Sequence, residues 1–371
     1  MNQRNILQNI SKIIERDSKS TTYKFALLRG VIDIIQDNSP YITFLGDRVY
    51  IPTGLLVEKW ILFYYPIFES SEAIPQIHGS ANVAFRSQIE TIIDAYRPMG
   101  GFSGFYNDLK NKGIPENNRC DFIALAKQVA RTITRMPMKH IGWSVHNQHY
   151  SIFQYSKGQI SRDSNVVGIQ FLIQSFGEFS IPREYYEAFK ILGSFISGRD
   201  SIFVRWAEFS VNASGQRLSV DRVMNEVLKS PITERAIRES KQLYSIILQN
   251  EGSVRCVWTG QTIASFDIDH MIPFSVWRNN DLWNLLPSRA SINNKKRNKI
   301  PAPELIESRK ECILHYWDLA YGREPERFRN EIQLSLLGKQ SFDGWHRTAM
   351  DQLKNSCKYL INSRGYEAFQ L

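Results

Sequence analysis

The pattern of apolar residues divides the chain into a long helical part and a short mixed part. Up to about residue 215, apolar positions mostly recur every three or four residues, which is typical of helices with one buried face. The segment from Asp121 to Met136 is an example, with Phe122 and Val129 on one stripe. Residues 138–155 alternate instead and indicate a β-hairpin, whereas residues 167–176 fit a helix or a strand equally well.

A row of basic residues follows another face of the helix predicted at 121–136. Lys127, Arg131 and Arg135 recur every four positions along it. Such a row can follow a phosphate backbone. A solvated helix face is the commoner meaning of the pattern, so the sequence leaves both interpretations open.

The pattern changes at Phe266. Phe266 and Ile268 alternate with Asp267 and Asp269, which is the period of two of a half-buried strand. His270 follows at the predicted strand end, where its side chain can face solvent from a rigid backbone.

A loop and a short basic helix are expected after this strand. Pro273 and the run 279–281 are typical of a loop, because proline removes a donor and Asn and Asp tolerate turn conformations. Ser288 is the expected N-cap of a helix over 289–298.

Composition indicates a folded protein with a polyanionic partner. The chain has 371 residues, of which 43% are hydrophobic, and its formal net charge is +9. These values exclude an intrinsically disordered chain and suit nucleic acid as a ligand without proving it. The most apolar stretch, Gly54–Phe68, is interrupted by Glu58 and Lys59 and is too short to cross a bilayer, so we expect no membrane insertion. Thr53 is expected to cap this helix.

The cysteines argue against a zinc clamp. Cys120, Cys256, Cys312 and Cys357 are scattered and form no close pair, whereas structural zinc needs about four ligands. Together with the lack of an apolar signal-peptide core in the first eight residues, this spacing predicts a reducing, cytoplasmic location.

The segment 254–301 resembles an HNH endonuclease, of the ββα-metal or His-Me finger class. Asp269, His270, Asn284, Asn293 and Pro301 stand at the spacing of that family. The resemblance implies hydrolysis of phosphodiester bonds in DNA. It also implies a small ββα-metal finger, in which residues 256–260 supply the first strand and turn of the ββ hairpin. Together with the helical pattern up to residue 215, this predicts a fold of the α+β class, in which a mainly helical N-terminal region is followed by that finger.

The resemblance assigns a role to each site residue. His270 is the implied general base, and Asp269 and Asn293 are the implied metal ligands, so that these three residues and Asn284 make up the catalytic set. Asn284 is expected to pin the loop and orient the imidazole. Asn294 is the alternative to Asn293, which the Asn-x-x-Lys frame favours.

The chemistry agrees with these residue types. A neutral imidazole has an unperturbed pKa of about 6.5 and suits proton abstraction near neutral pH. Carboxylate and amide oxygens suit Mg²⁺ or Mn²⁺ better than zinc. We therefore expect Mg²⁺ (or Mn²⁺) as the cofactor and no structural zinc.

Basic residues cluster beside the predicted metal ligands and are expected to contact DNA phosphates. This set consists of Arg289, Lys295, Lys296, Arg297 and Lys299. A solvated helix face is again the simpler alternative.

The predicted organisation has four parts. They are an N-terminal domain of unknown role (1–215), a helical connector (216–250), the HNH finger (251–303) and C-terminal helices (304–371). Because the finger is too small to bury a core alone, the last helices are expected to brace it.

The predicted function is a metal-dependent DNA endonuclease that nicks duplex DNA as a monomer. The run 274–288 also resembles bacterial HNH proteins of antiphage defence, such as the nuclease of type II Zorya systems, which would add other defence subunits as partners. Two alternatives stay open: a DNA-binding or scaffold subunit that does not cleave, and an RNase or toxin-type nuclease.

Overall fold

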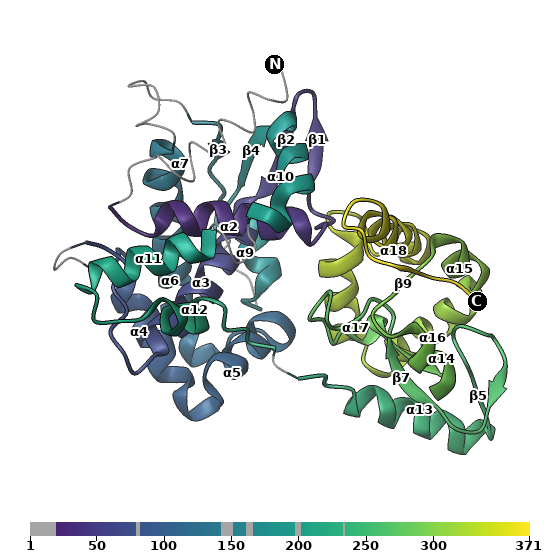
Figure 1. The fold of residues 1–371 in the computed structure, drawn as a ribbon. Helices are drawn as coiled ribbons and strands as arrows, with labels where there is room; N and C mark the ends of the chain where they lie inside the picture. The colour runs from purple at the N-terminus through teal and green to yellow at the C-terminus, as the bar shows by residue number, and fades with distance from the viewer. Residues whose placement is uncertain (1–19, 79–81, 142–150, 161–165, 197–201, 233) are drawn as a thin grey trace. The chain divides into compact units, whose positions relative to one another are not determined.

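A computed structural model describes residues 20–78, 82–141, 151–160, 166–196, 202–232 and 234–371 (Figure 1). The chain divides into two compact units. The helical unit contains the residues up to Asp37 together with 42–231, and the C-terminal unit contains 38–41 together with 232–371. In the described part of the chain, no helix combines the length and the apolarity that a bilayer crossing needs.

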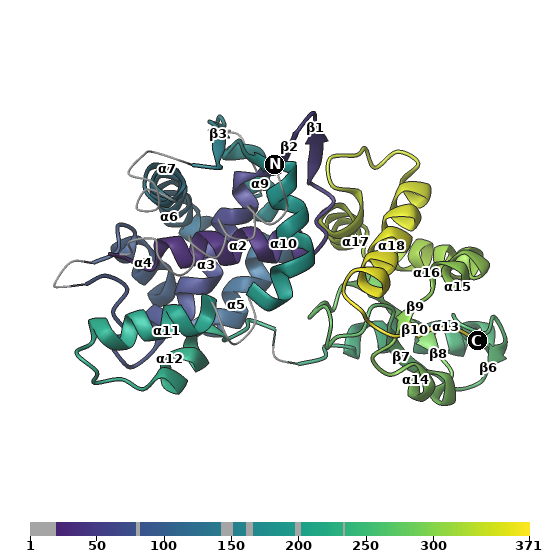
Figure 2. The same ribbon diagram turned by 45° about the horizontal axis from the view of Figure 1, so that its top comes forward.

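The helical unit is built around α3 (Thr53–Glu69), which is buried along most of its length. Its aromatic side chains, including the fully buried Trp60 and Tyr64, form the centre of the core. Figures 1 and 2 show helices on several sides of α3. The other helical elements are α2 (Tyr23–Gln36), α4 (Arg86–Tyr96), η1 (Arg97–Met99), α5 (Gly101–Asn107), η2 (Asp108–Lys112), α6 (Glu116–Arg135), α7 (Pro137–His140), α9 (Ile169–Ser175), α10 (Arg183–Ile196), α11 (Ile202–Ala213) and α12 (Val220–Val227).

One antiparallel sheet completes the helical unit. Its strand order is β1-β2-β4-β3, with β2 and β4 paired over five residues. The strands are β1 (Thr43–Leu45), β2 (Arg48–Pro52), β3 (Gln154–Ser156) and β4 (Glu178–Pro182). The β-hairpin predicted for 138–155 therefore differs from the structure at both described ends: α7 occupies its start, and β3 pairs with β4. Its middle, 142–150, lies outside the described residues.

The C-terminal unit consists of small two-stranded sheets packed against helices. Strands β5 (Val254–Arg255) and β6 (Thr262–Ile263) form one antiparallel pair, and β7 (Asp267–His270) and β8 (Leu285–Ser288) form another. A parallel pair joins β9 (Ile300–Pro301) to β10 (Ala368–Phe369). The helical elements are α13 (Arg238–Glu251), η3 (Leu282–Asn284), α14 (Ala290–Lys296), α15 (Pro303–Ser308), α16 (Lys310–Arg323), α17 (Pro325–Ile332), η4 (Gln333–Leu337) and α18 (Trp345–Asn362).

A shared aromatic core joins the strands of the C-terminal unit to its last helices. Trp258, Trp283 and Trp317 are fully buried in it. The Trp317 ring stacks on Trp345 with centroids 6.0 Å apart, and its indole N–H donates to the Trp283 carbonyl over 2.8 Å. The short strands thus bury their apolar side chains against α16 and α18, because so few strand residues cannot form a core alone.

Three sequence-based boundaries need correction. Along the chain, the helical unit ends at Pro231 and the C-terminal unit resumes at Ile232, so the predicted connector 216–250 is divided, with α12 in the helical unit and α13 in the C-terminal unit. Ser288 lies in β8 and does not cap α14, whose N-cap position is held by Arg289. Helix α14 ends at Lys296, because Arg297 adopts a φ of +50° that cannot continue a helix.

Candidate active site

The strand–strand–helix run of β7, β8 and α14 places the predicted site residues together. In the β7–β8 ladder, Asp269 pairs with Leu286 and His270 with Leu285. Only Asp267 is exposed in β7, so the polar face of the predicted half-buried strand is not solvated at Asp269. That carboxylate is 4% exposed, and therefore needs polar partners inside the protein.

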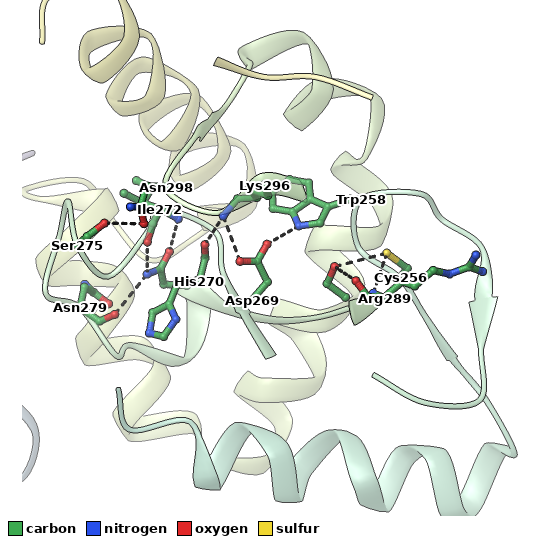
Figure 3. Close-up of polar contacts among 12 residues, drawn as sticks. Cys256, Trp258, Asp269, His270, Ile272, Ser275, Asn279, Arg289, Lys296 and Asn298 are labelled. Carbon is green, nitrogen blue, oxygen red and sulfur yellow. Dashed lines mark hydrogen bonds and ion pairs between the residues drawn. The ribbon is translucent and has the colours of Figure 1, made fainter. Parts of the chain in front are cut away.

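Asp269 finds two such partners (Figure 3). Its Oδ2 accepts a hydrogen bond of 2.6 Å from the indole N–H of Trp258. Its Oδ1 lies 3.1 Å from the ammonium of Lys296. Burial raises the pKa of Asp269, and the Lys296 charge and the Trp258 hydrogen bond act against that rise.

Lys296 corrects a sequence prediction. Its side chain is 0% exposed, so it is not the surface phosphate contact that the basic cluster predicted. Besides Asp269, its ammonium donates to the His270 carbonyl over 2.7 Å, and it lies 5.6 Å from the Trp258 ring centroid. Lys296 therefore ties the end of α14 to β7.

The His270 imidazole is held uncharged at neutral pH. Burial lowers the pKa of His270 to about 4, with smaller lowering from the charges of Arg235 and Lys296, while the Asn280 hydrogen bond raises it. His270 Nε2 lies 3.1 Å from Asn280 Oδ1. The ring also meets the Phe274 ring edge-on, with centroids 5.5 Å apart.

Asn280 fixes which imidazole nitrogen carries the proton. Its Nδ2 donates to the Glu234 carbonyl over 3.0 Å, so its Oδ1 is the atom that faces the ring. An amide oxygen only accepts hydrogen bonds. His270 Nε2 is therefore the donor, and Nδ1 keeps the lone pair that a general base needs.

Asn284 holds the loop, whereas the contact to the imidazole belongs to Asn280. The fully buried Asn284 accepts from the Ile272 N–H over 2.8 Å and donates to the carbonyls of Ile272 and Asn279. Asn280 was visible in the sequence only as part of a predicted loop, and nothing in that pattern marked it as a partner of His270.

Residues outside the predicted finger brace the same loop. Buried Glu331, on α17, accepts from the Leu282 N–H over 2.7 Å and pairs with Arg327. Buried Asp281 accepts from Trp283 Nε1 and from Ser335 Oγ. This bracing was not apparent in the sequence, because Glu331 and Ser335 lie about fifty positions further along the chain.

An open cleft of about 660 Å³ lies beside the imidazole. Asp269, His270, Asn293 and Arg297 line it, and so does Asn294, the alternative ligand. Arg235, which the sequence did not single out, adds a cation to the same wall. We call this space the His270 cleft. Its acid, imidazole, amides and guanidinium groups are the set expected for a phosphate substrate and a hard cation.

Most of the other basic residues predicted to contact DNA do not line the His270 cleft. Arg289 and Lys295 are exposed on the surface near α14 but do not line the cleft. Lys299 forms an ion pair with Glu367, so part of its charge is neutralised. Of the five predicted basic residues, only Arg297 faces the His270 cleft.

The donor atoms of the cleft fit a magnesium-type ion. In the described part of the chain, no three His, Cys, Asp or Glu side chains gather as a metal cage. Mg²⁺ takes one or two carboxylates and completes its shell with water and substrate phosphates. Each Asp269 oxygen accepts one hydrogen bond and keeps a further lone pair, and Asn293 offers an amide oxygen at the same cleft.

Comparisons with known proteins agree with this geometry. Residues 256–302 match the family described as HNH endonuclease, so this part of the chain is an HNH endonuclease domain. A 124-residue stretch is 27% identical to the CRISPR-associated endonuclease Cas9 of Listeria innocua serovar 6a (strain ATCC BAA-680 / CLIP 11262). That similarity spans 32% of this chain but only 8% of the relative.

The comparisons with solved structures and with a second family concern more of the chain. No solved structure matches the chain significantly. Residues 3–227 match the family described as Domain of unknown function (DUF8808). Because this match spans more than half of the 371 residues, the chain belongs to the DUF8808 family and carries an HNH endonuclease domain after it.

Proposed function

We propose that the chain is a metal-dependent endonuclease that hydrolyses DNA phosphodiester bonds in the His270 cleft. One observation supports this above the others: an uncharged imidazole shares a cleft with a carboxylate and an amide oxygen. The family match over residues 256–302 supports the nuclease class independently.

The proposed reaction needs a base and a positioned phosphate. His270 Nδ1 accepts a proton from the attacking water, while Asn280 holds the ring through Nε2. The water oxygen bonds to phosphorus as the bond to the 3′-oxygen breaks. Arg235 and Arg297, both on the cleft wall, attract the phosphodiester.

Asp269 and Asn293 are the residues that would hold the divalent ion. Such an ion supplies relief of negative charge on the leaving 3′-oxygen. Lys296 opposes the rise in the pKa of Asp269 that burial causes, and it holds the carboxylate in place through its 3.1 Å ion pair. The charge of Asp269 is thereby available to a cation that enters from the cleft.

The Asp269 contacts also favour a second candidate function, a subunit that binds DNA without cutting it. Both oxygens of this carboxylate already have hydrogen-bond donors. If those bonds satisfy it fully, a metal gains little at this position, and the cleft only grips phosphate.

A cleavage assay separates these candidates. Supercoiled plasmid is incubated with the protein and Mg²⁺ or Mn²⁺, with EDTA as the control, and parallel reactions contain single-stranded DNA or RNA. We expect open circles that depend on metal, and slower loss of the RNA. Retarded but uncut plasmid would establish the binding subunit, and preferential loss of RNA would establish an RNase.

We also propose that the protein nicks as a monomer and acts in bacterial defence. One His270 cleft holds one base and one set of metal ligands, so one strand is cut in each encounter. Linear DNA formed directly, at a rate that rises with the square of protein concentration, would show a cutting dimer. The defence role rests on the resemblance of residues 274–288 and predicts that His270→Ala removes protection in a phage plating assay.

A further inference from the structure

The helical unit contains a second cleft, of about 560 Å³, far from any catalytic residue in the sequence. Its walls come from α6, from β3 with the two residues after it, and from the end of α9. Lys127, Arg131, Arg135 and Lys157 line it, and among the described residues no Asp or Glu does. We call it the Arg131 cleft.

These four cations have no acidic partner within the described residues. The three from α6 are exposed and stand one helical turn apart, so their row is about 12 Å long. Lys157, exposed after β3, adds a cation from another element. Four like charges around one cavity repel each other, and an anion that binds there relieves the repulsion.

Two buried oxygens support a built site and not merely a charged surface. Thr53 and Gln88 line the cleft. Each has a buried side-chain oxygen, Thr53 Oγ1 and Gln88 Oε1, that has no hydrogen-bond partner among the described residues. Thr53 was expected to cap α3, but Thr53 is the first residue of that helix. Pro52 holds the N-cap position and makes no side-chain capping hydrogen bond. An unpartnered buried polar atom is costly, and a ligand with hydrogen-bonding groups satisfies it.

Two backbone segments beside the cleft pack closely against each other. A side chain at Gly158 would meet the backbone of Ser175 and Gly177 at 2.3 Å. Gly177 itself has a φ of +69°, which favours glycine. The backbone after β3 and the backbone after α9 therefore lie so close together that only glycine fits at positions 158 and 177. Phe176, next to Gly177, lines the cleft.

Aromatic rings lie beside the cations. Tyr155 is 46% exposed although it is a large ring, and it lines the cleft together with Phe176. Rings next to a basic row are the combination that binds single strands, because bases stack on the rings while phosphates meet the cations. A duplex offers no free base faces to such rings.

We propose that the Arg131 cleft binds a single strand of nucleic acid. The row on α6 contacts successive phosphates, and a base enters the cavity, whose volume is in the usual range for small-molecule sites. Thr53 and Gln88 supply polar contacts at its floor. The helical unit then captures a strand for the HNH domain, and this binding is independent of the cleavage reaction proposed for His270.

Fluorescence anisotropy of the full chain in EDTA, with a labelled oligo-dT strand, tests the proposal. K127Q/R131Q/R135Q should weaken binding at least tenfold at about 0.1 M salt. Each lost phosphate contact lowers the salt slope on a single strand by about 0.7, so the slope should fall by about 2. The matched control R97Q/K112Q/R205Q removes three cations of the same unit outside the cleft and should bind within twofold of wild type.

Several outcomes would overturn the proposal. They are unchanged binding by the cleft variant, an equal loss in the control variant, equal affinity for duplex, and displacement of the strand by an equal concentration of dTMP. Thr53→Val, which removes only the hydroxyl, should weaken strand binding about threefold without lowering the Tm. Unchanged affinity in Thr53→Val would refute the polar floor. Cleavage of a short duplex in Mg²⁺ is measured in parallel, so loss of strand binding and loss of the HNH reaction remain separate readouts.

Discussion

The His270 cleft and the Arg131 cleft differ in whether their charged groups have partners inside the protein. In the His270 cleft, the buried Asp269 is paired with Lys296 and bonded to Trp258. In the Arg131 cleft, four cations have no acidic partner among the described residues, and two buried oxygens have no donor. The charges of the proposed active site are compensated inside the protein, whereas the proposed strand site leaves its cations for a bound anion to compensate.

This difference predicts how each cleft responds to substitution. A residue in the His270 cleft has several partners, so its loss disturbs both stability and chemistry. A cation in the Arg131 cleft has no acidic partner among the described residues, so we expect its loss to change strand binding and not stability. The predictions below test that contrast, beginning with the largest expected effect.

His270→Ala should lower the cleavage rate by about 10²- to 10⁴-fold, because it removes the general base. DNA affinity should stay within about twofold of wild type, since the cations of the cleft remain. Plasmid nicking and anisotropy on the same preparation measure the two quantities. Cleavage near the wild-type rate would remove His270 from the mechanism.

Lys296→Met should destabilise the protein by about 3–5 kcal/mol, because the buried Asp269 loses the cation that compensates it. Urea unfolding measures the change. The exposed neighbour variant Lys295→Met is the control, and Arg131→Met extends the comparison to the other cleft. Both should change stability by no more than about 0.5 kcal/mol. Equal losses in all three variants would mean that the two clefts do not differ as described.

How far the sequence predicted these sites depends on how close their residues lie in the chain. Asp269, His270 and Asn293 belong to one strand–loop–helix run, so local structure alone brings them together. The burial of Lys296 could not be read locally, because it depends on Trp258 from a separate hairpin and on where α14 ends. Lys296 was therefore predicted from the sequence to be exposed like its basic neighbours.

The Arg131 cleft shows the same limit more strongly. The row on α6 was visible as a periodic pattern, but a solvated face explained it equally well. What distinguishes the two interpretations is the placement of Thr53, Gln88 and Lys157 around that row. Those residues come from three other parts of the chain, and only the packing of α3 and the pairing of β3 with β4 assemble them.

The pH dependence of stability should differ between wild type and His270→Ala. The pKa of His270 is about 4 in the folded protein and about 6.5 when unfolded, so the unfolded state takes up the proton first. Stability is full above pH 6.5 and is lost as pH falls towards 4, by about 2–3 kcal/mol. Urea unfolding at pH 7 and 4.5 should show this loss in wild type and not in His270→Ala. Identical pH profiles would show that the imidazole is not held neutral, and the Arg131 cleft variants should keep the wild-type profile.

Asn280 substitutions give the finest test, because they change the imidazole environment without removing the base. Asn280→Ala deletes the hydrogen bond that raises the pKa of His270 and frees the ring, so cleavage should fall about tenfold and its acid limb should move to lower pH. Asn280→Asp keeps an acceptor and adds a negative charge, which favours the imidazolium. Its acid limb should move to higher pH, with partial recovery of the rate. The exposed Ser291→Ala, on α14, is the control and should match wild type. Rates that fall equally in both Asn280 variants, with no opposite shift of the acid limb, would mean that Asn280 only supports the loop and that the proton on Nε2 is not set by this contact.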